Sequence, residues 1–238
     1  LLSRRQRQMC IRDRNRLILY YLKNGRTNIA LYEAQKMLKE AQEEDDKTGL
    51  SRCYNIMSQI YTVKRLDSMA FEWQLKEIEL TEKYDLENYN ISQTYSQISS
   101  YYINTNQPEK ALEALKKADA TAYSPTQKIS VQLEYVNYYS KFGDMQAAEK
   151  ILNECKTAFD QDKRLWSIKK RLYNIEYVYY LQSKQYPKAL EAAKKQEAEE
   201  LNLSESIQNS VHYLTKGKIY SNMGNMSEAI KYLSLIHI

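Results

Sequence analysis

Side chains that commonly carry enzyme chemistry are few in this sequence and form no recognisable group. The two histidines, His212 and His237, stand apart, and neither has the spacing of a metal-binding or catalytic pair. The segment Thr215–Lys218 (TKGK) lacks the spacing of a phosphate-binding loop and follows no predicted strand. Acidic runs such as Glu43–Asp46 are typical of solvated helix ends and not of acid–base pairs. We therefore predict no catalytic residue, no metal ligand and no cofactor.

One pairing of residues recurs along the chain and indicates internal repeats. A tyrosine is followed nine residues later by an alanine in the pairs Tyr21/Ala30, Tyr61/Ala70, Tyr102/Ala111, Tyr139/Ala148, Tyr180/Ala189 and Tyr220/Ala229. Successive alanines lie 40, 41, 37, 41 and 40 residues apart. A regular period of this length is the signature of a repeat protein, in which stacked units bury a shared core.

Residues around the recurrent tyrosine predict a pair of helices in each repeat. Tyr54, Met57, Ser58 and Tyr61 follow the i, i+3, i+4, i+7 spacing of one helix face. Four residues after the tyrosine stands a turn residue or a long polar one, at Gly25, Arg65, Asn106, Gly143, Lys184 and Gly224. The alanine then falls early in a second helix, where its small side chain lets the two helices approach closely. The 22 tyrosines are expected to pack in the seams between helices, with an aromatic ligand site as the alternative.

This pattern resembles that of the tetratricopeptide repeat (TPR) family. Tyr213, Gly217, Tyr220, Gly224 and Ala229 match its order of aromatic and small residues best. The resemblance implies an all-α fold, a right-handed α-solenoid of about six stacked antiparallel helix pairs. Repeats near 40 residues exceed the TPR length of about 34. We therefore expect longer helices, or longer links such as Glu43–Gly49.

The expected organisation is a single TPR-like array over residues 15–233. Its repeats are expected at about 15–50, 51–91, 92–128, 129–169, 170–209 and 210–233, the last one truncated. Residues 1–14 and 234–238 resemble translated sequencing-adapter reads, and we interpret them as a non-native leader and tail.

The net charge of the chain depends on its first fourteen residues. The formal charge is +5, but five of the 35 basic residues and one of the 30 acidic residues lie in residues 1–14. The remainder, with 30 basic and 29 acidic residues, offers no basic face of the kind that nucleic-acid binding requires. We predict no nucleic-acid partner.

We also predict no membrane span, because no stretch of about 18 apolar residues occurs.

Cys53 and Cys155 fall two repeats apart in this frame and are predicted to be free, packed thiols. Packed helices lie about 8–10 Å apart, whereas a disulfide brings two Cα atoms within about 7 Å. The third cysteine, Cys10, lies in the proposed leader. The cysteines therefore leave the compartment open, either cytoplasmic or, for part of a membrane-bound regulator, periplasmic.

The family resemblance also implies where a partner would bind. In TPR proteins the first helix of each repeat lines a concave groove, with side chains at fixed offsets from the recurrent tyrosine. Carried over to this sequence, those positions are Arg52, Asn55, Gln59, Gln93, Ser96, Ser100, Asn137, Ser140, Arg171, Asn174, Leu181, Lys218 and Ser221. Most are amides or short polar groups that suit an extended peptide backbone, although solvent-facing helix positions are polar in any case.

The sequence thus favours a non-catalytic scaffold that binds a peptide or a segment of another protein. The alternative is a sensor segment of a bacterial signal-transduction regulator, with a histidine-kinase or helix-turn-helix output domain outside this sequence. A carboxylate-based hydrolase is disfavoured because the frame shows no paired acids pointing inward. The oligomeric state is not predicted.

Overall fold

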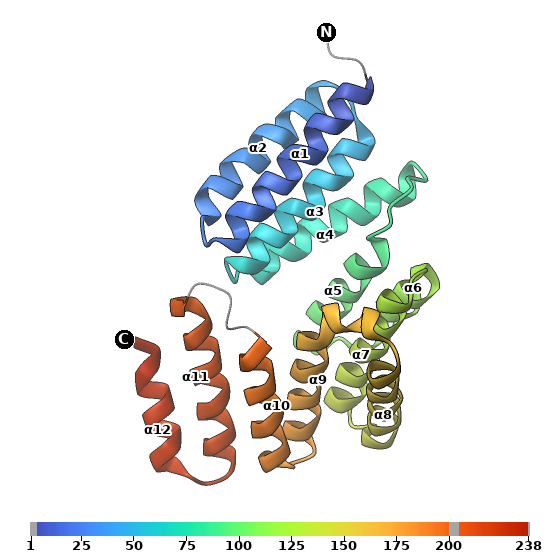
Figure 1. Ribbon diagram of the computed structural model, residues 1–238. Coiled ribbons are helices and arrows are strands. Elements are labelled where there is room, and N and C mark those ends of the chain that lie inside the picture. Colours follow the sequence, from blue (N-terminus) through green and yellow to red (C-terminus); the bar gives the residue numbers. More distant parts are fainter. Residues whose placement is uncertain (1–3, 200–204, 238) are drawn as a thin grey trace. The chain divides into compact units, whose positions relative to one another are not determined.

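The computed structural model describes residues 4–199 and 205–237, and the regular elements in these ranges are helices (Figure 1). In chain order they are α1 (Arg4–Lys23), α2 (Thr27–Glu43), α3 (Lys47–Val63), α4 (Asp67–Lys83), α5 (Ile91–Asn104), α6 (Pro108–Thr121), α7 (Pro125–Phe142), α8 (Met145–Gln161), η1 (Lys163–Ile168), α9 (Lys169–Gln182), α10 (Tyr186–Glu199), α11 (Glu205–Asn222), α12 (Met226–Ser234) and η2 (Leu235–His237). The predicted all-α fold is confirmed. None of the described helices combines the length and apolar character needed to cross a bilayer.

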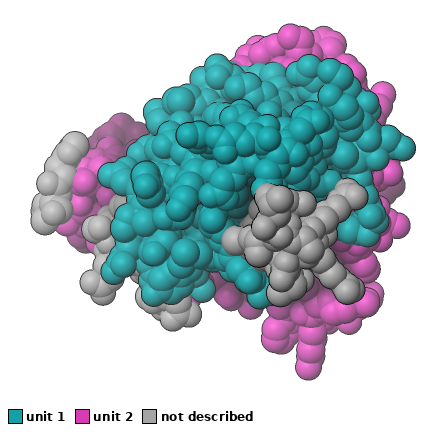
Figure 2. Space-filling model, turned by 90° about the horizontal axis from the view of Figure 1, so that it is seen from above, with its two compact units in different colours: residues 1–101 teal, residues 102–238 magenta. Residues whose placement is uncertain are grey.

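The chain divides into two compact units, Leu1–Tyr101 and Tyr102–Ile238, which Figure 2 colours separately. The division falls within α5. The predicted leader has no structural boundary of its own, because α1 continues through residue 14 and the Arg14 guanidinium lies 2.5 Å from the Glu40 carboxylate. Whether residues 1–14 and 234–238 are foreign to the native protein stays a prediction, as do the repeat boundaries.

In every repeat a left-handed residue follows the end of the first helix, four positions after the recurrent tyrosine. The φ angles there are 70° at Gly25, 59° at Arg65, 60° at Asn106, 99° at Gly143, 59° at Lys184 and 77° at Gly224. In five of the six turns, the next N–H donates to the tyrosine carbonyl over 2.8–2.9 Å, as in a Schellman motif. Glycine adopts this backbone without strain. The same turn geometry nevertheless recurs where the sequence supplies arginine or lysine, at Arg65 and Lys184.

Each recurrent alanine is the fourth residue of the second helix of its repeat. Its N–H donates over 3.0 Å to the carbonyl of the residue just before the helix. The six side chains are Ala30, Ala70, Ala111, Ala148, Ala189 and Ala229, and none is more than 3% exposed. The short turn and the buried alanine together set how closely the two helices of a hairpin pack.

The extra length of the repeats lies mainly in the helices. Helices α2, α3, α4 and α8 each contain 17 residues, and α7 contains 18. A long link at Glu43–Gly49 was wrong, because α2 ends at Glu43 and α3 begins at Lys47. The Asp46 carboxylate accepts from the Gly49 N–H over 3.1 Å, which starts α3 at once. Longer interruptions occur instead at residues 84–90 and at η1.

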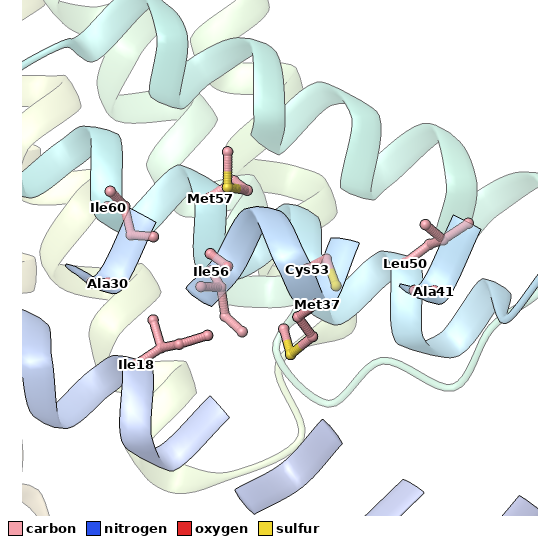
Figure 3. Packing of buried hydrophobic residues seen from close by; sticks show 10 residues of the cluster. Ile18, Ala30, Met37, Ala41, Leu50, Cys53, Ile56, Met57 and Ile60 are labelled. Carbon is pink, nitrogen blue, oxygen red and sulfur yellow. The ribbon is translucent and has the colours of Figure 1, made fainter. Parts of the chain in front are cut away.

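Each unit has its own apolar core. In the first unit, Ile18 from α1, Met37 from α2, and Cys53, Ile56 and Ile60 from α3 meet in one cluster (Figure 3). In the second unit, a cluster joins α7, α8, η1 and α9 and includes Leu133, Leu152, Leu165, Leu172 and Tyr179. The cores are therefore built between neighbouring helices, as expected for stacked repeats.

Candidate functional site

A buried carboxylate organises the polar side chains of the first unit. Glu77 on α4 is 1% exposed. Its oxygens accept hydrogen bonds from Asn55 Nδ2 at 3.0 Å, Asn88 Nδ2 at 2.9 Å and Thr94 Oγ1 at 3.1 Å. No basic side chain among the described residues forms an ion pair with it. Burial raises the pKa of Glu77, and the three hydrogen bonds oppose that shift.

This carboxylate fixes side chains on the face predicted to line the groove. Asn55, bound to Glu77, accepts a hydrogen bond at its Oδ1 from Gln59 Nε2 over 2.6 Å. Asn88 also reaches toward Ser51, with 3.4 Å between Nδ2 and Oγ. The network therefore holds two predicted binding residues, Asn55 and Gln59, in defined orientations on α3.

A second buried carboxylate plays the corresponding part in the second unit. Glu134 on α7 is 3% exposed. Its Oε1 accepts from Asn137 Nδ2 at 2.8 Å, and its Oε2 accepts from the Arg171 guanidinium at 2.9 Å. One carboxylate thus binds two residues that were predicted to line the groove, Asn137 and Arg171, and these come from different repeats. In the described part of the chain, no other hydrogen bond involves the Asn137 side chain, whose Oδ1 stays available as an acceptor.

The structure separates the predicted binding residues into three groups. The exposed ones are Arg52, Gln93, Asn174, Lys218 and Ser221, and the half-buried ones are Asn55, Gln59, Ser100, Asn137, Arg171 and Leu181. Ser96 and Ser140 are buried, at 1% and 4% exposure. The Ser96 hydroxyl donates to the Ser92 carbonyl over 3.0 Å, and the Ser140 Oγ has no partner among the described residues. These two serines therefore cannot face a bound partner.

Sequence reasoning missed both buried glutamates because it treated carboxylates as solvated. A signal was present for Glu77. Ala70, Gln74, Glu77 and Thr81 are spaced by four, three and four residues, which places them on one helix face, and all four are buried. The buried alanine could have marked Glu77 as an inward-facing acid.

Residues considered for chemistry lie in packed surroundings. Cys53 and Cys155 are free and buried, and burial raises the pKa of each thiol to about 12. Thiols with so high a pKa are poor nucleophiles at neutral pH. His212 is buried within α11. Within residues that the structure describes, no group of three or more potential metal ligands occurs.

Solved structures with similar folds place the chain in a class. Over 94% of this chain and 90% of the other, it resembles the type IV pilus biogenesis factor PilW, with 18% identity and a TM-score of 0.59. It resembles NprR in complex with its cognate peptide NprX at 12% identity and a TM-score of 0.72, over 98% of this chain and 67% of NprR. The TPR-like repeats of a putative kinesin light chain from Podosopora anserina give 16% identity and a TM-score of 0.57, over 79% and 93%.

A tetratricopeptide repeat family model matches residues 213–235. Together with the structures, this match confirms that the chain is an all-α, TPR-type helical-repeat protein of the solenoid class. A second family model, described as 26S proteasome subunit RPN7, matches residues 62–195, which is more than half of the chain. The chain therefore belongs to that family. No curated protein matches the sequence.

Proposed function

We propose that the chain is a non-catalytic scaffold that binds a peptide, or an extended segment of another protein, along the first helices of its repeats. The observation that carries the proposal is the shared carboxylate of Glu134. It holds Asn137 of α7 and Arg171 of α9 on adjacent helices. Rigid polar groups supported from behind by a buried residue are what a binding surface needs, because little entropy is lost when a ligand arrives.

The chemistry left on this surface suits a peptide backbone. Asn137 retains its Oδ1 acceptor, and Arg171, whose side chain is 30% exposed, retains N–H donors beyond the one given to Glu134. An acceptor and a donor side by side match the N–H and C=O groups of one extended peptide unit. In the first unit, the Asn55 and Gln59 amides, fixed by Glu77, offer comparable groups. The peptide complex of NprR supports this assignment at the level of the fold.

A random linear peptide library displayed on phage, panned against the full chain, tests the proposal. Enriched peptides are then measured by calorimetry against Asn137→Ala and Arg171→Ala. We expect each substitution to weaken binding roughly tenfold, which corresponds to about 1.4 kcal/mol. Asn153→Ala and Lys150→Ala, at exposed positions of the second helix α8, are the matched controls and should bind as the unmodified chain does.

Two outcomes would contradict the proposal. One is a library that yields no sequence enriched over an empty support. The other is a set of peptides whose affinities fall equally with the control substitutions on α8, because binding would then not involve the first helices.

A sensor segment of a bacterial regulator stays the second hypothesis, since peptide recognition on the same face would serve it. The long repeats, rich in tyrosine and asparagine, motivate this hypothesis. The unbroken reading frame tests it: a membrane helix followed by a histidine-kinase or helix-turn-helix domain would support it. A reading frame without any output domain would exclude it.

A further inference from the structure

At each seam, where one repeat packs on the next, one pair of residues occupies the same place in the repeat pattern. The first residue of the pair stands eight positions after a recurrent alanine, and the second stands four positions before the next recurrent tyrosine. In the first unit both seams are apolar at this position. Leu38 packs against the cluster that contains Met57, and Ile78 and Ile98 are both buried, at 8% and 4% exposure.

In the second unit the same position becomes charged. Lys156 of α8 lies 2.8 Å from Glu176 of α9, measured from Nζ to Oε1. In the next seam, Glu197 of α10 lies 2.6 Å from Lys216 of α11, measured from Oε2 to Nζ. The positions are equivalent, but the polarity of the pair is reversed. In the preceding seam, burial and, to a smaller extent, the Asp119 carboxylate raise the pKa of Tyr135.

These pairs are sheltered enough for a wrong neighbour to be costly. The Glu176 side chain is 7% exposed and that of Lys216 is 12% exposed. A charge buried to this extent needs a partner of opposite sign, and a like charge in its place is strongly unfavourable. Lys156 and Glu197 are more exposed, at 41% and 32%, and reach inward to their partners.

We propose that the alternating polarity of Lys156–Glu176 and Glu197–Lys216 fixes the order in which the last three repeats stack. If α11 packed on α8 and skipped a repeat, Lys216 would face Lys156. If α10 packed on α9 of a second copy, Glu197 would face Glu176. Repeats with nearly the same geometry are prone to such errors, and both errors bring like charges together.

Charge-reversal variants of the full chain test this proposal. One variant reverses the first pair (K156E/E176K), a second reverses the second pair (E197K/K216E), and a third reverses both. All carry Asp119→Asn, so that the carboxylate of the preceding seam cannot pair with a reversed charge. Reversal of Lys39 and Glu43, an exposed pair within α2 of the first unit, serves as the control. The readout is light scattering on a sizing column after refolding from urea, with amide exchange over residues 205–234.

The expected results distinguish an effect on the stacking order of the repeats from a general loss of stability. Each single-pair reversal keeps its native ion pair but makes a skipped stack attractive, so the native-size fraction should fall at least about twofold. Reversal of both pairs restores the alternation and should recover that fraction, whereas the α2 control should leave it unchanged. The proposal is overturned if the single-pair reversals refold like the parent. It is also overturned if the double reversal refolds as poorly as, or worse than, the single-pair variants.

Discussion

The Asn88 side chain donates a 2.9 Å hydrogen bond to the Glu77 carboxylate, eleven residues earlier in the sequence. Asn88 lies in the link between α4 and α5, and its Oδ1 also accepts from the Asn90 N–H over 2.9 Å. This arrangement ties the longest described link of the first unit to a buried acid. The stability of that link should therefore depend on the protonation of Glu77.

The first prediction is a pH dependence of folding that originates at Glu77. Burial raises the pKa of Glu77 above its ordinary value of 4.5, so the folded chain binds this proton more tightly than the unfolded chain. The contribution of this group to stability is therefore fully present below the unfolded-state pKa and declines as pH rises through the folded-state pKa. Glu77→Gln should remove this decline, as measured by urea unfolding across the acidic to neutral range.

The control for that experiment is Glu72→Gln, an exposed acid on the same helix α4. It should keep the pH dependence of the unmodified chain. If the free energies of unfolding of the unmodified chain and of Glu77→Gln differ by the same amount at every pH, Glu77 has no raised pKa and the prediction is wrong.

The second prediction concerns the left-handed turn residue Lys184, whose φ is 59°. A lysine in this conformation is strained, whereas glycine is not, although glycine loses more backbone entropy on folding. Lys184→Gly should therefore stabilise the chain by about 0.5–1 kcal/mol in chemical denaturation. Lys194→Gly, at an exposed position inside α10, should instead destabilise it by roughly 1 kcal/mol. Equal losses of stability from Lys184→Gly and Lys194→Gly would show that Lys184 is not strained.

The third prediction concerns Ala148, which is fully buried on α8. A phenylalanine at this position would have to displace the first helix of the hairpin or adopt a strained rotamer. Ala148→Phe should therefore cost roughly 1–3 kcal/mol in the free energy of unfolding. Lys150→Phe, exposed on the same helix, should change it little. An unaltered thermal melt for Ala148→Phe would mean that the close approach of α7 and α8 does not depend on a small side chain.

The fourth prediction concerns thiol reactivity. Burial raises the pKa of both Cys53 and Cys155 to about 12, so neither forms an appreciable thiolate near neutral pH in the folded chain. In a Cys10→Ser background, a colorimetric disulfide reagent should label the folded chain slowly and label both thiols rapidly in urea. Fast labelling without denaturant would show that the cores around these residues open readily.

The tyrosine–alanine frame was sufficient to predict the helical pairs, because hairpin packing imposes local constraints that repeat along the sequence. A turn residue four positions after a recurrent tyrosine, and an alanine nine positions after it, are visible without coordinates. The same reasoning placed the turn at Lys184, where composition alone would not suggest a positive φ.

The candidate site was less predictable because its organising residues are charged. Asn137 and Arg171 could be named from the resemblance, but Glu134, which joins them, reads as an ordinary surface acid. The distance in sequence between Glu134 and Arg171 is 37 residues, and only the stacking of α7 on α9 brings them together. Ser96 and Ser140 failed as surface residues for a related reason, since small polar side chains fit equally well in a seam. The binding role of the remaining positions stays a prediction.

The ion pair between Glu134 and Arg171 also limits where the chain can be truncated. A polypeptide ending after α8 would retain the buried acid while losing the Arg171 guanidinium that pairs with it. Removing one partner of a buried ion pair typically costs several kcal/mol. Any shortened version meant for crystallisation or spectroscopy should therefore keep α7 and α9 in the same piece, whichever helices are trimmed elsewhere.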